Sequence, residues 1–372
     1  MDQKGKAIQW NNVLRLQVAV ISALFLGFLI IVIFSSNPLE TFRVFLTGPV
    51  LHLNRFGDWI EDAITLTILG LSVCIVFSAK QNNLGAEGQM TLGSLAAGLV
   101  ILYLPLPPFL LIIVALAAGM LAGACWGIIP GVLKAHMHAD ELVSSLMLNY
   151  VAVKFYEYFI TFQLTPEGAG FVASKPFTEE SKLASFIPNL PFLSKLREQF
   201  IQKTDVTIFL YIAAAIVVLV CFIMFRTNLG YEIRLVGQNA AFAKYSGIGV
   251  TRVIVLASLI SGAVAGLAGT HVSLCIHRRL LIGVAAGFGF EGVVVSLLAR
   301  NNPKWIPLAA FAYSYLRIGA DVMERSSDVS RELVLIIQGL IILFITSERK
   351  LKLKKLRSLF GKRVAKESEA IS

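Results

Sequence analysis

Charged residues are scarce in this chain: they make up 15% of its 372 residues, whereas hydrophobic residues make up 56%. Soluble domains average roughly 25% charged residues. The mean hydropathy is +0.74, and apolar runs long enough to cross a bilayer recur along the sequence. The composition excludes an ordinary soluble domain and predicts an all-α polytopic membrane protein.

Cysteine and clustered histidine are also rare. The four cysteines lie in or beside apolar runs without C-x-x-C spacing, which is typical of small buried side chains and not of disulfides. His136 and His138 lie two residues apart in a polar loop, with no Cys or further His beside them. A structural zinc site needs about four ligands, so we predict no metal site.

Catalytic motifs are missing as well. There is no G-x-x-x-x-G-K-S/T phosphate loop, so we expect no ATP hydrolysis on this chain, and there is no H-E-x-x-H. Residues 287–292 fit G-x-G-x-x-G, but that fingerprint requires a preceding strand and a βαβ unit, which the pattern does not show. We therefore predict no enzymatic activity on this chain and no cofactor of its own.

The net charge of +10 is unevenly distributed. Residues 348–372 contain nine Lys or Arg against three Glu, and residues 226–252 contain four against one. Excess Lys and Arg mark the cytoplasmic side, so we predict both termini and the 226–252 connection inside. The basic tail directly follows an apolar run, which favours anionic lipid headgroups over nucleic acid as its neighbour.

We predict ten apolar segments. The longest connection, 163–205, joins the fifth segment to the sixth on the outer side of the membrane and is well placed to meet another protein. Glycines at four-residue spacing, Gly119, Gly123 and Gly127, predict close helix packing in the fourth segment. The segments are 16–34, 60–79, 91–104, 109–129, 143–162, 207–225, 253–273, 292–299, 306–320 and 333–345.

A polar stretch, residues 82–90, separates the second segment from a third that is too short to span a bilayer alone. Its Gly-Ala-Glu-Gly, residues 85–88, returns as Gly-Phe-Glu-Gly at residues 289–292, before another short run. Paired interruptions in two halves point to a transporter's substrate site. We predict a permease domain, 1–348, with inverted halves at about 60–162 and 253–346, and a basic cytoplasmic tail, 349–372.

Polar residues in and near these interruptions are the candidates for the substrate pathway. Glu87 and Glu291 either cap the half-helices, contact substrate directly or couple transport to protons. Arg317 and Gln338 are weaker candidates, since polar residues in a bundle often only join helices. The predicted pathway residues are Asn82, Asn83, Glu87, Gln89, Asn149 and Glu291.

The inner connection contains a candidate short helix, residues 240–245. Asn239 is positioned to cap it and Gly247 to end it. A helix of this length is not stable alone, so it requires a partner surface on the cytoplasmic side. The alternative is an irregular solvated loop.

Several segments together resemble permeases of ABC-type importers for purine nucleosides and simple sugars. Residues 82–89 resemble that family's FNIGAEGQ signature, and residues 140–150 its EVISTLMLNYIA segment. Matches to the cytoplasmic loop, to GxGFDGIAVALLG and to VIQGLIIL follow in order, at residues 229–248, 287–300 and 333–343.

The resemblance implies an importer permease of the bacterial cell membrane, which pairs with a second permease and two copies of a cytoplasmic ABC ATPase. An extracellular substrate-binding lipoprotein would deliver the substrate. In this interpretation a coupling helix docks on the ATPase, and its residues are Asn239, Ala240, Ala241, Phe242, Lys244 and Tyr245.

Within this resemblance, the sequence of residues 83–89, Asn-Leu-Gly-Ala-Glu-Gly-Gln, favours the nucleoside branch of the family over the ribose branch. The departures from the family pattern are Asn82 for Phe, Leu84 for Ile, Glu291 for Asp and Ala299 for Gly, and Asn82 adds a polar group near the pathway. The alternatives are a sugar or branched-chain amino-acid importer permease, and a stand-alone proton-coupled carrier that uses Glu87 and Glu291.

Overall fold

The computed structural model describes residues 35–137, 139–168, 170–178, 206–283 and 287–329, with a few further positions outside these ranges. The chain divides into two compact units, one of Met1–Leu46 with Ala320–Ser372 and the other of Thr47–Gly319. The larger unit, Thr47–Gly319, holds every residue of the site described below.

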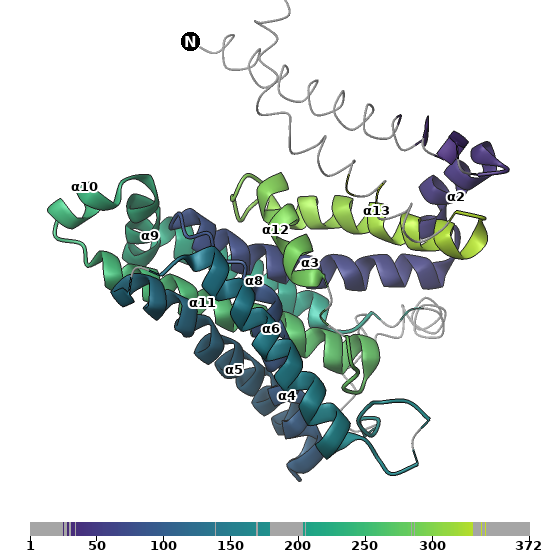
Figure 1. Ribbon diagram of the computed structural model, residues 1–372, viewed down its shortest axis with the longest axis horizontal. Helices are drawn as coiled ribbons and strands as arrows, with labels where there is room; N and C mark the ends of the chain where they lie inside the picture. Colours follow the sequence, from purple (N-terminus) through teal and green to yellow (C-terminus); the bar gives the residue numbers. More distant parts are fainter. Residues whose placement is uncertain are drawn as a thin grey trace, which may run out of the picture. The chain divides into compact units, whose positions relative to one another are not determined.

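The described part of the chain is helical, and its β pairing is limited to one bridge between Ala173 and Leu281 (Figure 1). This confirms the prediction of an all-α protein for these residues. The α-helices are α2 (Pro38–Leu51), α3 (Leu53–Ser78), α4 (Ala86–Tyr103), α5 (Pro108–Met137), α6 (Glu141–Phe159), α8 (Phe209–Arg226), α9 (Asn228–Gln238), α10 (Ala240–Tyr245), α11 (Val250–His271), α12 (Phe288–Leu298) and α13 (Ile306–Ser326). Two π-helical turns, η1 (Ile160–Leu164) and η4 (Val272–His277), extend α6 and α11.

Four described segments are long and apolar enough to cross a membrane: Leu53–Ser78, Pro108–Met137, Phe209–Arg226 and Val250–His277. α12 is apolar but shorter, as predicted for a half-helix. These segments support a multi-pass membrane protein, while the total of ten spans stays a prediction. Most of the first and last predicted spans, most of the 163–205 connection, Gln338 and the basic tail lie outside the described residues.

Several helices extend beyond their predicted limits because polar residues occupy their first or last turns. α3 begins at Leu53 and not at residue 60, so Glu61 and Asp62 lie well inside the helix. α4 already begins at Ala86, which places Glu87 and Gln89 in its first two turns. α12 begins at Phe288, four residues earlier than predicted.

Close contact between α5 and α11 confirms the predicted role of the glycine row. A methyl group at Gly123 would collide with the carbonyl oxygen of Gly262 and would lie 2.8 Å from the α-carbon of Gly266. The two backbones therefore touch, as small residues permit in lipid. In Figure 1, α4, α5, α6 and α11 run alongside one another, and α11 also packs on α3.

α3 is the central helix of the larger unit. Of its most apolar 18 residues 89% are buried, compared with 28% for α5 and for α8. In a bilayer the exposed apolar faces of α5 and α8 would meet lipid, whereas α3 is surrounded by protein. The interruption that follows α3 is thus set inside the helical bundle.

Candidate functional site

The chain between α3 and α4 is fixed to α6 by three side chains spaced four residues apart. This spacing places them on one face of α6, where each accepts a hydrogen bond from a backbone N–H of the interrupted segment. The donor and acceptor pairs are Asn82 and Glu141 (2.8 Å), Leu84 and Ser145 (3.1 Å), and Gly88 and Asn149 (2.9 Å).

Asn149 makes a second contact with the same segment. Its Nδ2 donates to the carbonyl oxygen of Leu84 at 2.8 Å, so its amide holds both sides of the turn into α4. Glu141 is also paired, at 2.7 Å from the Nζ of Lys134. Non-helical backbone at membrane depth needs such internal partners, and α6 supplies them. Asn149 therefore positions the start of α4.

Two further predicted pathway residues are enclosed. Asn83 and Gln89 are 3% and 1% exposed. Asn83 Oδ1 accepts from the N–H of Gly85 at 2.7 Å, whereas Asn83 Nδ2 and Gln89 Oε1 have no hydrogen-bond partner within the described structure. Asn82, by contrast, is exposed.

Glu87 connects the two half-helices. Its Oε1 accepts from the backbone N–H of Gly287, the residue at the start of α12, at 3.3 Å. A Cβ atom on Gly289 would lie 2.6 Å from the Cβ of Glu87, so the first turns of α4 and α12 touch. The residue at the start of α4 is Gly85, without a side-chain cap, so Glu87 contacts the other half-helix and not the end of its own.

Glu291 forms an ion pair with Arg317 on α13, with 3.0 Å between Oε2 and Nη1. The same nitrogen lies 2.6 Å from Oδ1 of Asp62 on α3. The guanidinium also lies over the ring of Phe288, 4.2 Å from its centroid. Arg317 thus joins α3, α12 and α13 beside the start of α12.

A second ionisable cluster is buried between α3 and α11. Oε2 of Glu61 lies 2.7 Å from Nε2 of His271, and Nδ1 of the same ring lies 2.9 Å from Oγ1 of Thr65. Oε1 of Glu61 accepts from the N–H of Thr207 at 3.2 Å. His271 is fully buried and packs on the ring of Phe209. The cluster joins α3, α11 and the segment that leads into α8.

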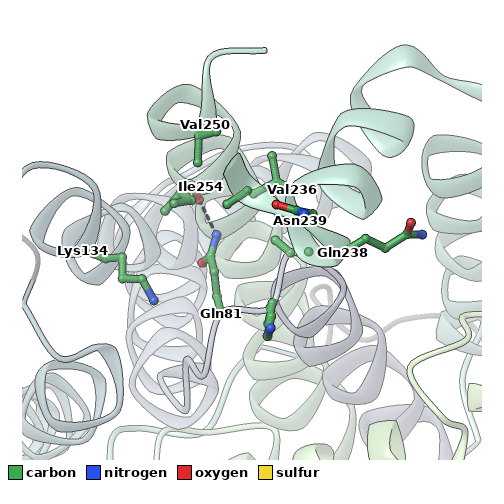
Figure 2. Close-up of a pocket in the computed structure, with 11 residues that line it drawn as sticks. Gln81, Lys134, Val236, Gln238, Asn239, Val250 and Ile254 are labelled. Carbon is green, nitrogen blue, oxygen red and sulfur yellow. Dashed lines mark hydrogen bonds between the residues drawn. The ribbon is translucent and has the colours of Figure 1, made fainter. Parts of the chain in front are cut away.

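A pocket of about 300 Å³ lies between the end of α3, α11 and the α9–α10 pair (Figure 2). Gln81 reaches across one side of it. Its Nε2 donates to the carbonyl oxygen of Ile254 at 3.0 Å, and its Oε1 accepts from Oγ of Ser258 at 2.9 Å. Lys134 and Asn239 also line the pocket, so the interrupted segment and the inner connection share one cavity.

The inner connection contains the predicted short helix, α10. Asn239 Oδ1 accepts from the N–H of Phe242 at 3.0 Å, and Gly247, with φ of 84°, follows the helix end. This confirms the predicted helix, its cap and its stop. Phe242 is 53% and Tyr245 91% exposed, which leaves the helix surface open to a partner. Its role in docking stays a prediction.

The comparisons with known proteins agree with this architecture. A family model described as "branched-chain amino acid transport system / permease component" matches residues 56–346. The chain belongs to this family of permeases. The chain is 31% identical to the glucose ABC transporter permease protein TsgB13 of Haloferax volcanii, over 89% of its own length and 86% of the relative's.

Two further relatives have similar coverage. The permease is 30% identical to the guanosine ABC transporter permease protein NupP of Bacillus subtilis, over 89% of its own length and 92% of the relative's. It is 28% identical to the nucleoside ABC transporter permease protein NupB of Lactococcus lactis, over 88% and 89% respectively. No solved structure matches the permease significantly. The permease is a transporter subunit and not an enzyme, and a separate ATPase hydrolyses ATP.

Sequence reasoning missed three ionisable residues of the permease: Glu61, Asp62 and His271. Glu61 and Asp62 fall at the edge of the predicted segment 60–79, a position where ionisable residues ordinarily face water. His271 lies within an apolar run, where an ionisable residue is a functional candidate by default. That signal identifies His271, whereas only the start of α3 at Leu53 shows that Glu61 and Asp62 lie well inside a helix.

Proposed function

We propose that this permease forms the membrane pathway of an ATP-driven importer for nucleosides. The observation that carries the proposal is the similarity to a guanosine permease and a nucleoside permease along nearly nine-tenths of each chain. Glucose is the second candidate substrate, because a glucose permease is similarly related. The proton-coupled carrier alternative has no support among these three relatives.

We place the substrate pathway beside the first turns of α4 and α12. Asn82, Glu87 and Glu291 retain solvent access and are the candidates for direct contact with substrate. Asn83, Gln89 and Asn149 are enclosed, so their proposed role is to shape the wall of the pathway. The carboxylates and the helix N–H groups would together offer acceptors and donors for the hydroxyl groups and base of a nucleoside.

The proposed architecture has ten membrane segments in two inverted halves, 60–162 and 253–346, with both termini in the cytoplasm. The contact between α4 and α12 supports it, because the two short helices start next to each other and each carries the repeated Glu. Transporters with inverted repeats build their substrate sites from such paired interruptions. Residues 1–348 would form the permease domain and 349–372 a basic cytoplasmic tail.

For coupling, we propose that α10 docks on the ABC ATPase, and that a second permease and an extracellular substrate-binding lipoprotein complete the importer. α9 offers a route from α10 to the interrupted helix. A methyl group at Gly237 would collide with the carbonyl oxygen of Ser78 at the end of α3. A displacement of α9 would therefore act directly on the end of α3 and on the polar stretch, residues 82–90, that follows it.

Uptake of radiolabelled guanosine into vesicles that contain the permease and its ATPase tests the proposed substrate. We expect uptake that depends on the ATPase and is competed by unlabelled purine nucleosides but not by glucose or ribose. Competition by glucose alone would support the second candidate instead. Uptake that persists without the ATPase and follows a proton gradient would contradict the importer mechanism.

The variant Lys244→Glu tests the docking of α10. Reversal of an exposed charge on α10 should weaken co-purification of the ATPase while membrane insertion stays unchanged. Arg252→Glu is the matched control, since Arg252 is also exposed and follows α10 at the start of α11. Equal loss in both variants, or no loss in Lys244→Glu, would contradict docking through α10.

A further inference from the structure

Two cationic side chains from distant parts of the chain meet at one aromatic ring. The Nζ of Lys304 lies 4.9 Å from the centroid of the Phe225 ring, and the Cζ of Arg234 lies 5.6 Å from it. Phe225 is near the end of α8, Arg234 is on α9 and Lys304 precedes α13. We call Phe225, Arg234 and Lys304 the cationic corner. Their convergence concentrates positive charge at one point of the larger unit.

Within the described part of the chain, no carboxylate pairs with the cationic corner. Neither Arg234 nor Lys304 forms an ion pair with any residue in the part of the chain that the structure describes. Nη1 of Arg234 is buried and has no hydrogen-bond acceptor there. A buried charged donor without a partner is unfavourable, and the ring face compensates only a small part of this cost. An anion from outside the chain would satisfy this donor, and the exposed Lys304 would add a second positive charge to hold it.

The position of the cationic corner indicates where that anion comes from. α8 is apolar, largely exposed and long enough to cross a membrane, and it ends at Arg226. Trp305, the residue after Lys304, is 58% exposed, and Trp side chains gather at the membrane surface. In a membrane that α8 crosses, the corner would therefore lie at the level of the lipid headgroups, next to the face of α8 that lipid would cover.

The turn from α8 into α9 keeps the corner close to the membrane surface. A methyl group at Gly230 would lie 2.7 Å from the α-carbon of Met224 and would collide with the carbonyl oxygen of Ile223. α9 therefore crosses directly against the last turn of α8. Arg234 is one turn beyond this crossing, so its guanidinium returns to the ring of Phe225.

We propose that Arg234 and Lys304 bind the phosphate group of an anionic phospholipid, with the acyl chains along α8. In the orientation proposed above for the importer, this lipid would belong to the cytoplasmic leaflet. The phosphate site itself does not depend on that orientation. Because Gly237 of the same helix touches the end of α3, a lipid held at Arg234 would also fix α9 against the interrupted helix. Anionic lipid would then support coupling between the ATPase and the pathway.

Native mass spectrometry of the purified permease, without the ATPase, tests the site with two lipids. We expect phosphatidylglycerol to be retained more strongly than phosphatidylcholine. The double variant Arg234→Gln/Lys304→Gln should weaken retention of phosphatidylglycerol about twenty-five-fold, since each basic residue near a charged surface contributes a factor of about five. Arg252→Gln, which removes one exposed charge from the start of α11, should leave it unchanged. The conservative variant Arg234→Lys keeps the positive charge and should therefore retain the lipid. It distinguishes an effect of the lost charge from an effect on folding.

Equal retention of phosphatidylglycerol by the double variant and the parent would overturn the proposal. Displacement of the lipid by inorganic phosphate at equal concentration would also overturn it, since the site would then bind a free anion. Loss of the lipid when the ATPase assembles would assign the corner to an acidic side chain of that partner. Because none of these measurements involves transport, they are independent of whether nucleosides are the substrate.

Discussion

The two half-helices carry the same Gly-x-Glu-Gly pattern, yet the structure holds their starts in different ways. The segment that leads into α4 is fixed by three side chains of α6, and its residues Asn83 and Gly85 are buried. The start of α12 is exposed at Gly287, which has φ of 85°, and it is held by contacts with the side chains of Glu87 and Arg317. A repeated motif therefore does not imply a repeated mechanical role.

The difference suggests which half-helix moves during transport. α4 is bound to α6 through backbone hydrogen bonds that cannot be given up cheaply at membrane depth. The start of α12 is held by one backbone hydrogen bond, from the exposed Gly287 to Glu87, and by the ion pair of Glu291 with Arg317, and water can replace a contact at an exposed N–H. We expect α4 to act as the fixed wall of the pathway and α12 as the part that shifts.

The largest expected effect comes from removing the charge that holds α12. Arg317→Met deprives Asp62 and Glu291 of a shared cation in a largely buried setting. Breaking one side of a buried ion pair costs about 3–5 kcal/mol, and the 22% exposure of the Arg317 side chain places this variant at the lower end. We expect a loss of about 3 kcal/mol, measured by unfolding of the detergent-solubilised permease.

A charge-neutral background provides the control for Arg317. In the triple variant Asp62→Asn/Glu291→Gln/Arg317→Met no carboxylate is left facing the missing cation, so stability should recover by more than half. If the triple variant is less stable than Arg317→Met, the ion pairs do not account for the effect, and packing of the guanidinium on Phe288 becomes the explanation.

The next effect tests the fixed half-helix. Asn149→Ala leaves the N–H of Gly88 and the carbonyl oxygen of Leu84 buried without this partner, which costs about 2 kcal/mol. Ser144→Ala on the same helix is the matched control, because the Ser144 hydroxyl bonds only within α6, and it should change stability by less than about 0.5 kcal/mol. Similar losses in both variants would show that α6 does not specifically hold α4.

A smaller effect distinguishes the possible roles of Glu87. Glu87→Gln keeps an acceptor for the N–H of Gly287, so stability and uptake should stay close to those of the parent. Glu87→Ala removes the contact, at a cost of about 1 kcal/mol or about fivefold in the population of the α4–α12 contact. Uptake rates of the two variants decide the question. If Glu87→Gln is as damaging as Glu87→Ala, the charge itself is needed for substrate or proton contact.

The sequence predicts the helices of this protein better than their partners. Hydropathy and charge identify the apolar segments, and turn chemistry identifies α10 with Asn239 and Gly247, because these signals are local. The ion pair of Lys154 with Glu157, at 2.7 Å, is equally local, because residues three apart share one face of a helix. The glycine row in α5 predicts close packing, but it does not name α11 as the partner.

Contacts between distant residues could not be predicted in this way. Asp62 and Arg317 are 255 residues apart, and Glu87 and Gly287 are 200 apart. The predicted segment 60–79 places Asp62 at the edge of a helix, because hydropathy does not recognise a helix whose first turns are polar. Asn149 illustrates the same limit: its position in an apolar segment marks it as important, but only the fold shows that it holds α4.

The smallest effect concerns a carboxylate that binds a helix start outside the membrane. Asp328 Oδ2 accepts from the N–H of Ser36 at 2.7 Å, two residues before α2, and its Oδ1 accepts from the Ser35 hydroxyl. The Ser36 backbone N–H, followed by the Ser35 hydroxyl, lowers the pKa of Asp328 from its ordinary value of 3.8 to about 2. Because the folded pKa is depressed, this contribution is complete above 3.8 and is lost as the pH falls toward about 2.

Hydrogen exchange of the peptide that contains Ser36 measures this contribution. Protection should be constant from neutral pH to about 4 and should then decrease toward about 2 in the parent. Asp328→Asn keeps an acceptor but does not titrate, so its protection should not change over the same range. An equal decrease in Asp328→Asn would assign the change to another group. If the parent kept its protection down to pH of about 2, the contact with Ser36 would not depend on the charge of Asp328. A neutral acceptor would then be sufficient at this helix start, as we expect it to be in Glu87→Gln.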